Sequence, residues 1–490
     1  MKDKKQNKRI NGGHRLLFFC ILCLFGLYVA VSYAEEQPQR EQSKTKVILL
    51  HTDNLTYDQY RHPGAQILTG NVQFQHDGVL MYCDSACFYE ATNSFDAFGH
   101  VKMVQGDTLD LVGDMLLYNG LDQLARVRHN VVLTHRESKL YTDSLDYDRL
   151  YELGYFFEGG KLVDKDNVLT SDWGQYSPPT RQAVFNYNVK LENPKFTLIS
   201  DTLNYNTLTS MAEIVGPSNI DSGDNHIYSE SGFYNTQTEE AILLDRSIVT
   251  NKGRKMVGDS LYYDSKSGVG EGFRNVVYTD EVNKNMLTGN YCYYNDSTGY
   301  SMATDSAVAI DYSQRDTMYM HADTFKVYTF YMDTDSMYRE VRGYHKVRSY
   351  RMDVQSVCDS LVFDSRDTCI TMYRDPIVWN GGQQVLGEVI KVYLNDSTID
   401  RIHVIDQTLS VDRIDSVHYN QVAGKEMTSY FRDGEMYETW VNGNVYVDYY
   451  MFDDDSLMIG LNYTETTELK LFMKDRKMEK IWMPASTGVI

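Results

Sequence analysis

The feature that most constrains this chain is an internal repeat of six residues with the form acidic-x-apolar-x-aromatic-Asp/Asn. Clear copies read Asp143-Ser-Leu-Asp-Tyr-Asp148 and Asp201-Thr-Leu-Asn-Tyr-Asn206. Twelve copies begin at residues 53, 84, 114, 143, 172, 201, 230, 259, 290, 323, 359 and 388, and five consecutive spacings are 29 residues. A fixed period of this length indicates a chain built by stacking one supersecondary unit.

A second signal follows most copies, as in Gly70-Asn-Val-Gln-Phe74 and His129-Asn-Val-Val-Leu133. We expect the Gly or Asn to open a turn and the apolar alternation after it to form a strand. Polar stretches such as those at residues 204–207 and 264–267 predict further turns. Each unit therefore reads strand, turn, strand, turn, in keeping with 39 tyrosines, only 8 prolines and almost no helical periodicity.

The hexapeptide also predicts a bend within the strand. Leu140 and Thr142 occupy even positions, whereas Leu145 and Tyr147 occupy odd ones, so the alternation slips by one residue at Asp143. A strand that slips once must bulge, because otherwise every later side chain would change faces. We therefore predict an all-β fold, an elongated β-jellyroll or solenoid-like stack of V-shaped antiparallel strands on a repeat of 29 residues, with an apolar interior.

Several function classes are disfavoured by the sequence. A net charge of −21 argues against a protein that grips nucleic acid along its phosphates. Twelve similar carboxylates make poor partners for acid–base catalysis, which needs two different environments, and Asp and Ser at a bend serve to satisfy freed backbone groups. A stacked calcium site is the weaker interpretation of these carboxylates. We expect no enzyme activity, no catalytic residues, no metal and no cofactor.

The first 34 residues predict export. Basic residues precede an apolar run from Leu16 to Val31, and small residues end at Ala34, which is the pattern of a signal peptide. An uncleaved inner-membrane anchor is the alternative, and residues 35–46 are predicted to be a linker. The exported part has an odd number of cysteines, which predicts free, buried or semi-buried thiols rather than a disulfide framework; they are Cys83, Cys87, Cys292, Cys358 and Cys369.

These patterns carry a resemblance. The stretch from Leu140 to Asp148 and the segment Gly70-Asn-Val72 resemble the repeat of the OstA-like, or LptA-type, periplasmic lipopolysaccharide-transport family. The likeness runs from about Val47 to Asp400, and the C-terminal part is similar to the ends of long OstA-like proteins from Bacteroidetes-type bacteria. It implies a β-jellyroll whose apolar interior holds lipid A acyl chains and whose edge strands join neighbouring jellyrolls end to end.

The resulting hypothesis is a periplasmic, non-enzymatic bridge or carrier for lipopolysaccharide or a related glycolipid in outer-membrane assembly. Its partners would be other jellyroll components and outer-membrane assembly proteins, not nucleic acid, and association with the inner or outer membrane stays open. We predict OstA-like repeats at residues 47–220 and 221–400 and a related C-terminal segment at 401–490. The predicted lipid-binding interior comprises Leu116, Tyr118, Val131, Leu133, Leu145, Tyr147, Leu203, Tyr205, Leu261 and Tyr263.

Two alternatives remain. A structural or adhesive β-solenoid without lipid cargo would use the same repeat. A parallel β-helix polysaccharide lyase would also stack rungs of similar length, but it needs a cluster of Arg, Lys and Asp on one face, whereas the basic residues here are scattered.

Overall fold

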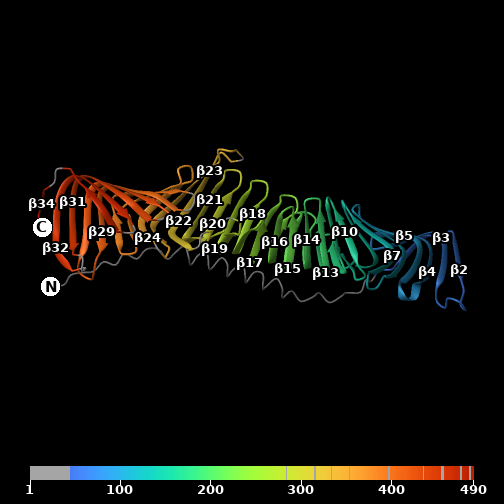
Figure 1. The fold of residues 1–490 in the computed structure, drawn as a ribbon. Helices are drawn as coiled ribbons and strands as arrows, with labels where there is room; N and C mark the ends of the chain where they lie inside the picture. The colour runs from blue at the N-terminus through green and yellow to red at the C-terminus, as the bar shows by residue number, and fades with distance from the viewer. Residues whose placement is uncertain are drawn as a thin grey trace, which may run out of the picture.

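The computed structural model describes residues 45–489 apart from residues 283, 314–315, 333, 353, 396–397, 434, 454–456, 475–476 and 485–486. The predicted signal peptide and most of the predicted linker lie outside the described residues. The described residues form one antiparallel sheet of 34 strands and a single 3-10 turn, η1 (Glu90–Thr92). The sheet is long and rolled along its length (Figure 1), which confirms the predicted all-β stack.

The strands of the first half are β1 (Ile48–His51), β2 (Asn54–Tyr57), β3 (Gln66–His76), β4 (Val79–Tyr89), β5 (Ser94–Gln105), β6 (Leu109–Asn119), β7 (Leu124–His135), β8 (Ser138–Asp148), β9 (Leu153–Phe156), β10 (Gly160–Asp164), β11 (Asn167–Ser171), β12 (Trp173–Ser177), β13 (Gln182–Asn193), β14 (Phe196–Asn206), β15 (Met211–Ser222), β16 (Asn225–Asn235) and β17 (Glu240–Asn251). Those of the second half are β18 (Arg254–Asp264), β19 (Val269–Asp280), β20 (Asn285–Asn295), β21 (Tyr300–Asp311), β22 (Met318–Phe330), β23 (Tyr338–Tyr350), β24 (Val354–Asp364), β25 (Cys369–Tyr373), β26 (Ile377–Asn380), β27 (Gln383–Leu386), β28 (Val389–Asn395), β29 (Thr398–Arg413), β30 (Tyr419–Arg432), β31 (Glu435–Phe452), β32 (Met458–Lys474), β33 (Lys477–Trp482) and β34 (Thr487–Val489).

The strands bend where the hexapeptide predicts. Between β7 and β8, Val131 pairs with Thr142 and Arg128 pairs with Ser144, so the register shifts at Asp143. The two residues left over on β7, His129 and Asn130, have φ angles of 62° and 52°. The expectation that Gly or Asn opens a turn at this signal is therefore wrong. These left-handed residues lie inside a continuous strand and form the bulge that bends it.

The repeated acidic residue holds this bulge. Its carboxylate accepts a hydrogen bond from an asparagine side chain that lies in the bulge of another strand. Asparagine–aspartate pairs of this kind are Asn71–Asp53 (3.0 Å), Asn130–Asp114 (2.6 Å), Asn188–Asp172 (2.6 Å) and Asn275–Asp259 (2.8 Å). At Gly70, whose φ is +84°, a Cβ would lie 2.2 Å from the Asp53 Oδ2 atom, so only glycine fits. The repeated carboxylates thus have a structural role at the bend.

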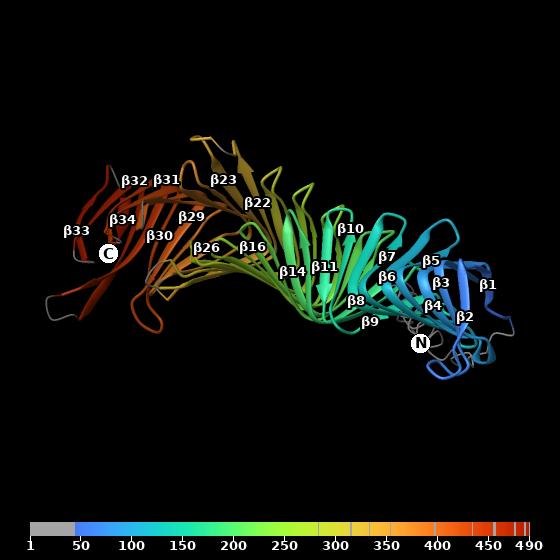
Figure 2. The ribbon, with the colours of Figure 1, turned by 90° about the vertical axis from the view of Figure 1, so that its right-hand side faces the viewer.

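Each bent strand has two arms. The tyrosine arm carries the third and fifth hexapeptide positions, such as Leu145 and Tyr147, and the valine arm carries the second signal, such as Val131 and Leu133. We call the open side opposite the bends, where the hairpin turns of both arms lie, the mouth. Figure 2 shows the sheet folded along its length in this way, so that both arms turn one face inward.

The inward faces form two apolar clusters, one from Val47 to Leu261 and one from Val276 to Leu469. The predicted divisions after residues 220 and 400 fall within β15 and β29, and the division into three parts stays a prediction. Among the described residues, no helix has the length and apolar character needed to span a membrane.

Candidate functional site

The structure places all ten predicted lipid-contacting residues on the inward face. Nine of them are buried, and Tyr263 is partly buried against the first cluster. The nine buried residues are Leu116, Tyr118, Val131, Leu133, Leu145, Tyr147, Leu203, Tyr205 and Leu261. They pack against one another, and their contact with lipid stays a prediction.

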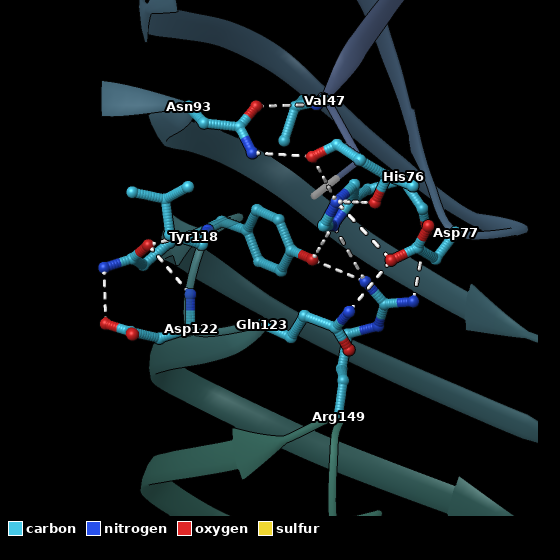
Figure 3. Close-up of polar contacts among 11 residues, drawn as sticks. Val47, His76, Asp77, Asn93, Tyr118, Asp122, Gln123 and Arg149 are labelled. Atoms are coloured by element: carbon cyan, nitrogen blue, oxygen red, sulfur yellow. Dashed lines mark hydrogen bonds and ion pairs between the residues drawn. The ribbon is translucent and has the colours of Figure 1, made fainter. Parts of the chain in front are cut away.

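Polar contacts close the mouth over the first part of this interior. Figure 3 shows the first of them, where the Tyr118 hydroxyl on β6 lies 2.6 Å from Nδ1 of His76 at the end of β3. Arg149 donates to the same hydroxyl and to the His76 carbonyl oxygen. On the other side of the ring, His76 Nε2 lies 2.9 Å from Thr45 Oγ1. All three side chains of the His76–Tyr118–Arg149 group are buried, so the tyrosine and valine arms are tied together across the mouth.

The same tie recurs along the sheet. His135 Nδ1 lies 2.7 Å from the Tyr176 hydroxyl, and Tyr205 donates to Asp164 Oδ2 over 2.8 Å. In each tie a fifth-position tyrosine meets a residue 41 or 42 positions earlier in the chain. Farther along, Lys195 pairs with Glu239 across the mouth. We call the interior from Val47 to Ile220, which these ties cover, the closed segment.

Burial sets the charge states of these groups. Desolvation raises the pKa of Tyr118 and Tyr205 and lowers the pKa of His76 and His135. Because the Arg149 guanidinium can only donate, Nδ1 of His76 acts as an acceptor, and Nε2 carries the proton toward Thr45. The histidine in this tie is therefore neutral.

The interior becomes more exposed beyond β17. Several inward apolar side chains of the tyrosine and valine arms are only half-buried there and contact the second apolar cluster, whereas others, such as Phe325 and Val347, are buried. We call the following set the half-exposed strip: Met256, Leu287, Ala309, Met320, Val341, Val354, Phe363 and Ile370. The accessible apolar interior therefore lies mainly C-terminal to the predicted residues, with Tyr263 at its start.

Small side chains explain this difference. The inward positions of β13 hold Phe185, Val189 and Leu191, which fill the space between the arms. The corresponding positions of β21 hold Ala303, Ala307 and Ala309, and those of the tyrosine arm of β19 hold two glycines. Alanine and glycine cannot fill the same volume, so solvent reaches the neighbouring side chains.

One glycine of β19 instead makes room for an inward aromatic ring. A Cβ on Gly270 would lie 2.0 Å from Cε1 of Tyr294, so the ring occupies the space that a side chain would need. Burial of that ring raises the pKa of the Tyr294 phenol, which is therefore neutral. Sequence reasoning missed the half-exposed strip because it followed the repeat positions; the glycines and alanines at inward positions were the available signal.

Other chemistry has no comparable site in the described part of the chain. No group of His, Cys, Asp and Glu among those residues could hold a metal ion. The cysteines Cys83, Cys87, Cys292, Cys358 and Cys369 are free, and all but Cys87 are buried, which confirms that prediction. Burial raises the pKa of the Cys83 thiol to about 12 and that of the Cys292 thiol to about 11.

Comparison with known proteins agrees with this architecture. The family described as OstA-like protein matches residues 44–201 and 196–259, which include the closed segment and the strands up to β17. No curated protein matches the chain. Membership of the OstA-like family implies a β-jellyroll protein related to lipopolysaccharide transport. The part of the chain from residue 44 to residue 259 therefore belongs to the OstA-like family.

Proposed function

We propose that this protein is a periplasmic, non-enzymatic bridge or carrier that holds the acyl chains of lipopolysaccharide or a related glycolipid against its half-exposed strip. The single observation that carries the proposal is the set of inward apolar side chains between Met256 and Ile370 that stay only half-buried although they lie between the two arms. Each CH₂ group of an acyl chain that moves from water to such a face contributes about 0.8 kcal/mol.

The two parts of the interior then have different tasks. In the closed segment, side chains such as Phe185 and Leu203 fill the space between the arms and leave no exposed apolar face. That segment serves as a rigid scaffold, and the wider part that follows receives the lipid. The related role in lipopolysaccharide transport comes from the family of residues 44–259.

Edge strands provide contacts with neighbouring components. At the N-terminal edge, Ile48 and Leu55 are more than half exposed. At the other edge, Ile459 and Trp482 expose apolar surface near β33 and β34. Unpaired backbone groups and apolar side chains at an edge favour pairing with a strand of another protein, here a jellyroll or an outer-membrane assembly partner.

Photocrosslinking in living cells tests the lipid proposal. A photoreactive residue is placed at inward positions Leu287 and Met320 and at the predicted Tyr263, with the adjacent Thr288 and His321 as outward controls. We expect lipid adducts at the three inward positions and none at the controls. Equal labelling of both sets, or no lipid adduct at all, would refute the proposal and favour a structural or adhesive β-solenoid.

A further inference from the structure

The outward face of the same strands carries a cluster of aromatic rings. We call it the tyrosine platform, and its members are Phe273, Tyr291, Tyr293, Tyr300, Tyr328, Phe330 and Tyr338. The rings form two runs. Phe273 and Tyr291 have centroids 5.3 Å apart, and Tyr293, Tyr300 and Tyr328 follow one another at 5.9 and 5.2 Å.

The register places these rings outside the jellyroll. Cys292 and Tyr294 face inward on β20, so Tyr291 and Tyr293 face outward because successive side chains alternate. Tyr300 pairs with Tyr328 across β21 and β22, and Phe330 pairs with Tyr338 across β22 and β23. The rings thus lie side by side on one face of five neighbouring strands, β19 to β23, and they are partly exposed rather than buried.

Several corresponding outward positions of the closed segment are polar, although Phe98 on β5 occupies the place of Phe273. On β7 and β8 they hold Arg126 and Asp146, whose side chains lie 3.6 Å apart, and on β14 and β15 they hold Asn204 and Glu213, which are hydrogen-bonded. A run of aromatic rings is not needed to build the sheet, since those strands form without one. The platform is therefore a local feature of β19–β23.

Cations and carboxylates lie among the rings. The guanidinium of Arg342 lies 5.0 Å from the Tyr328 ring centre, and that of Arg366 lies 4.1 Å from the Tyr338 ring centre. Both guanidinium groups also pair with carboxylates, Arg342 with Glu340 and Arg366 with Asp364. The surface consequently offers aromatic faces, hydrogen-bond donors and hydrogen-bond acceptors within one patch.

The platform is continuous with the mouth. Phe330 and Tyr338 stand at the ends of β22 and β23, where the hairpin turn lies at the mouth on the tyrosine arm. Their rings are stacked with centroids 4.7 Å apart, and Tyr331 in the same turn is 67% exposed. This hairpin projects beyond its neighbours (Figure 2). A molecule leaving the half-exposed strip through the mouth would meet these rings first and then the outward face of the same strands.

We propose that the tyrosine platform binds the sugar chain of the glycolipid whose acyl chains lie against the half-exposed strip. This inference rests on the proposed function and adds a second binding surface to it. Sugar rings have apolar C–H faces that stack on aromatic rings, and their hydroxyl groups need both donors and acceptors, which the Arg342–Glu340 and Arg366–Asp364 pairs supply. Both pairs contain opposite charges, so the surface also suits a largely neutral sugar chain better than an anionic membrane surface.

The test uses the full exported chain and an acyl-free oligosaccharide released from lipopolysaccharide by mild acid. Calorimetry compares the wild type with a variant carrying Tyr300→Thr and Tyr328→Thr, because threonine is β-branched and favourable in strands. Phe98→Thr and Tyr141→Thr, which remove two exposed aromatic rings elsewhere on the jellyroll, form the control variant. We expect the platform variant to bind about tenfold more weakly and the control to bind as the wild type does.

Two results would overturn the inference. They are an unchanged affinity of the folded platform variant and a folded wild type that does not bind the oligosaccharide; either would assign the rings to a protein partner or to packing. Lipid crosslinking from Leu287 separates this outcome from failure of the proposed function. Crosslinking without oligosaccharide binding refutes the platform alone, whereas oligosaccharide binding without crosslinking refutes the lipid carrier.

Discussion

Two tyrosines at the same repeat position provide a matched test of the mouth ties. Tyr147 and Tyr205 are both fully buried at the fifth position of a hexapeptide, two periods apart. The Tyr205 hydroxyl donates to Asp164 Oδ2 over 2.8 Å and accepts from Asn167 Nδ2 over 2.9 Å. The Tyr147 hydroxyl is buried without a hydrogen-bond partner. Replacement by phenylalanine removes the same atom from each while keeping the ring.

The expected costs differ because of what each hydroxyl leaves behind. In Tyr205→Phe the carboxylate of Asp164, which is 1% exposed, keeps Ser138 on Oδ1 but loses its donor on Oδ2. A lost hydrogen bond to a buried charged group costs about 1.5–3 kcal/mol of unfolding free energy. In Tyr147→Phe nothing is left unpaired and a desolvated hydroxyl is removed, so stability should stay unchanged or rise by up to about 1 kcal/mol.

Hydrogen exchange measured by mass spectrometry suits this comparison, because a stacked repeat opens locally as well as globally. Peptides covering β10, β11 and β14 should exchange faster in Tyr205→Phe, and peptides covering β8 should exchange at the wild-type rate or more slowly in Tyr147→Phe. Urea unfolding gives the total free energy. Equal losses in the two variants would show that ring packing, and not the hydrogen bond to Asp164, holds the mouth closed.

Three further predictions follow from burial. Burial lowers the pKa of His76 below its ordinary 6.5, so the contribution of the neutral side chain to stability is complete above pH 6.5. This contribution falls as the pH drops toward the pKa of His76 in the folded protein. The urea midpoints at pH 7.5 and pH 5 should therefore differ less in His76→Asn than in the wild type. Cys87, which is not fully buried, should react with iodoacetamide at pH 8 before Cys83, whose thiol is buried with its pKa raised to about 12; equal rates in the native protein would contradict this order. Ala309→Trp should fill the half-exposed strip and reduce lipid crosslinking from Leu287 while the chain stays folded. Ala183→Trp, in the closed segment, should instead lower the unfolding free energy by about 3 kcal/mol or more, because the buried position has no room for the ring. Circular dichroism during urea unfolding measures this loss.

The bent strand was predictable from local sequence. The change of parity at Asp143 requires a bulge wherever one face stays buried, and the structure has the register shift at that residue. The bulge on β7, opposite Asp143, was not predictable in the same way, because the residue types of His129 and Asn130 indicate a turn. Their left-handed angles fit a turn and a bulge equally well, and only pairing with β8 distinguishes the two.

The sequence by itself determined the repeat, the strand content and the inward parity of residues such as Leu145 and Tyr205, because alternation and period depend on neighbours along the chain. Only the tertiary structure decided where the interior is closed and where it is half-exposed. That outcome depends on the summed volume of inward side chains from both arms and on contacts such as Tyr205–Asp164 between residues 41 positions apart. A local pattern cannot specify such sums, since inward side chains pack against side chains of other strands, as Phe74 does against Phe95.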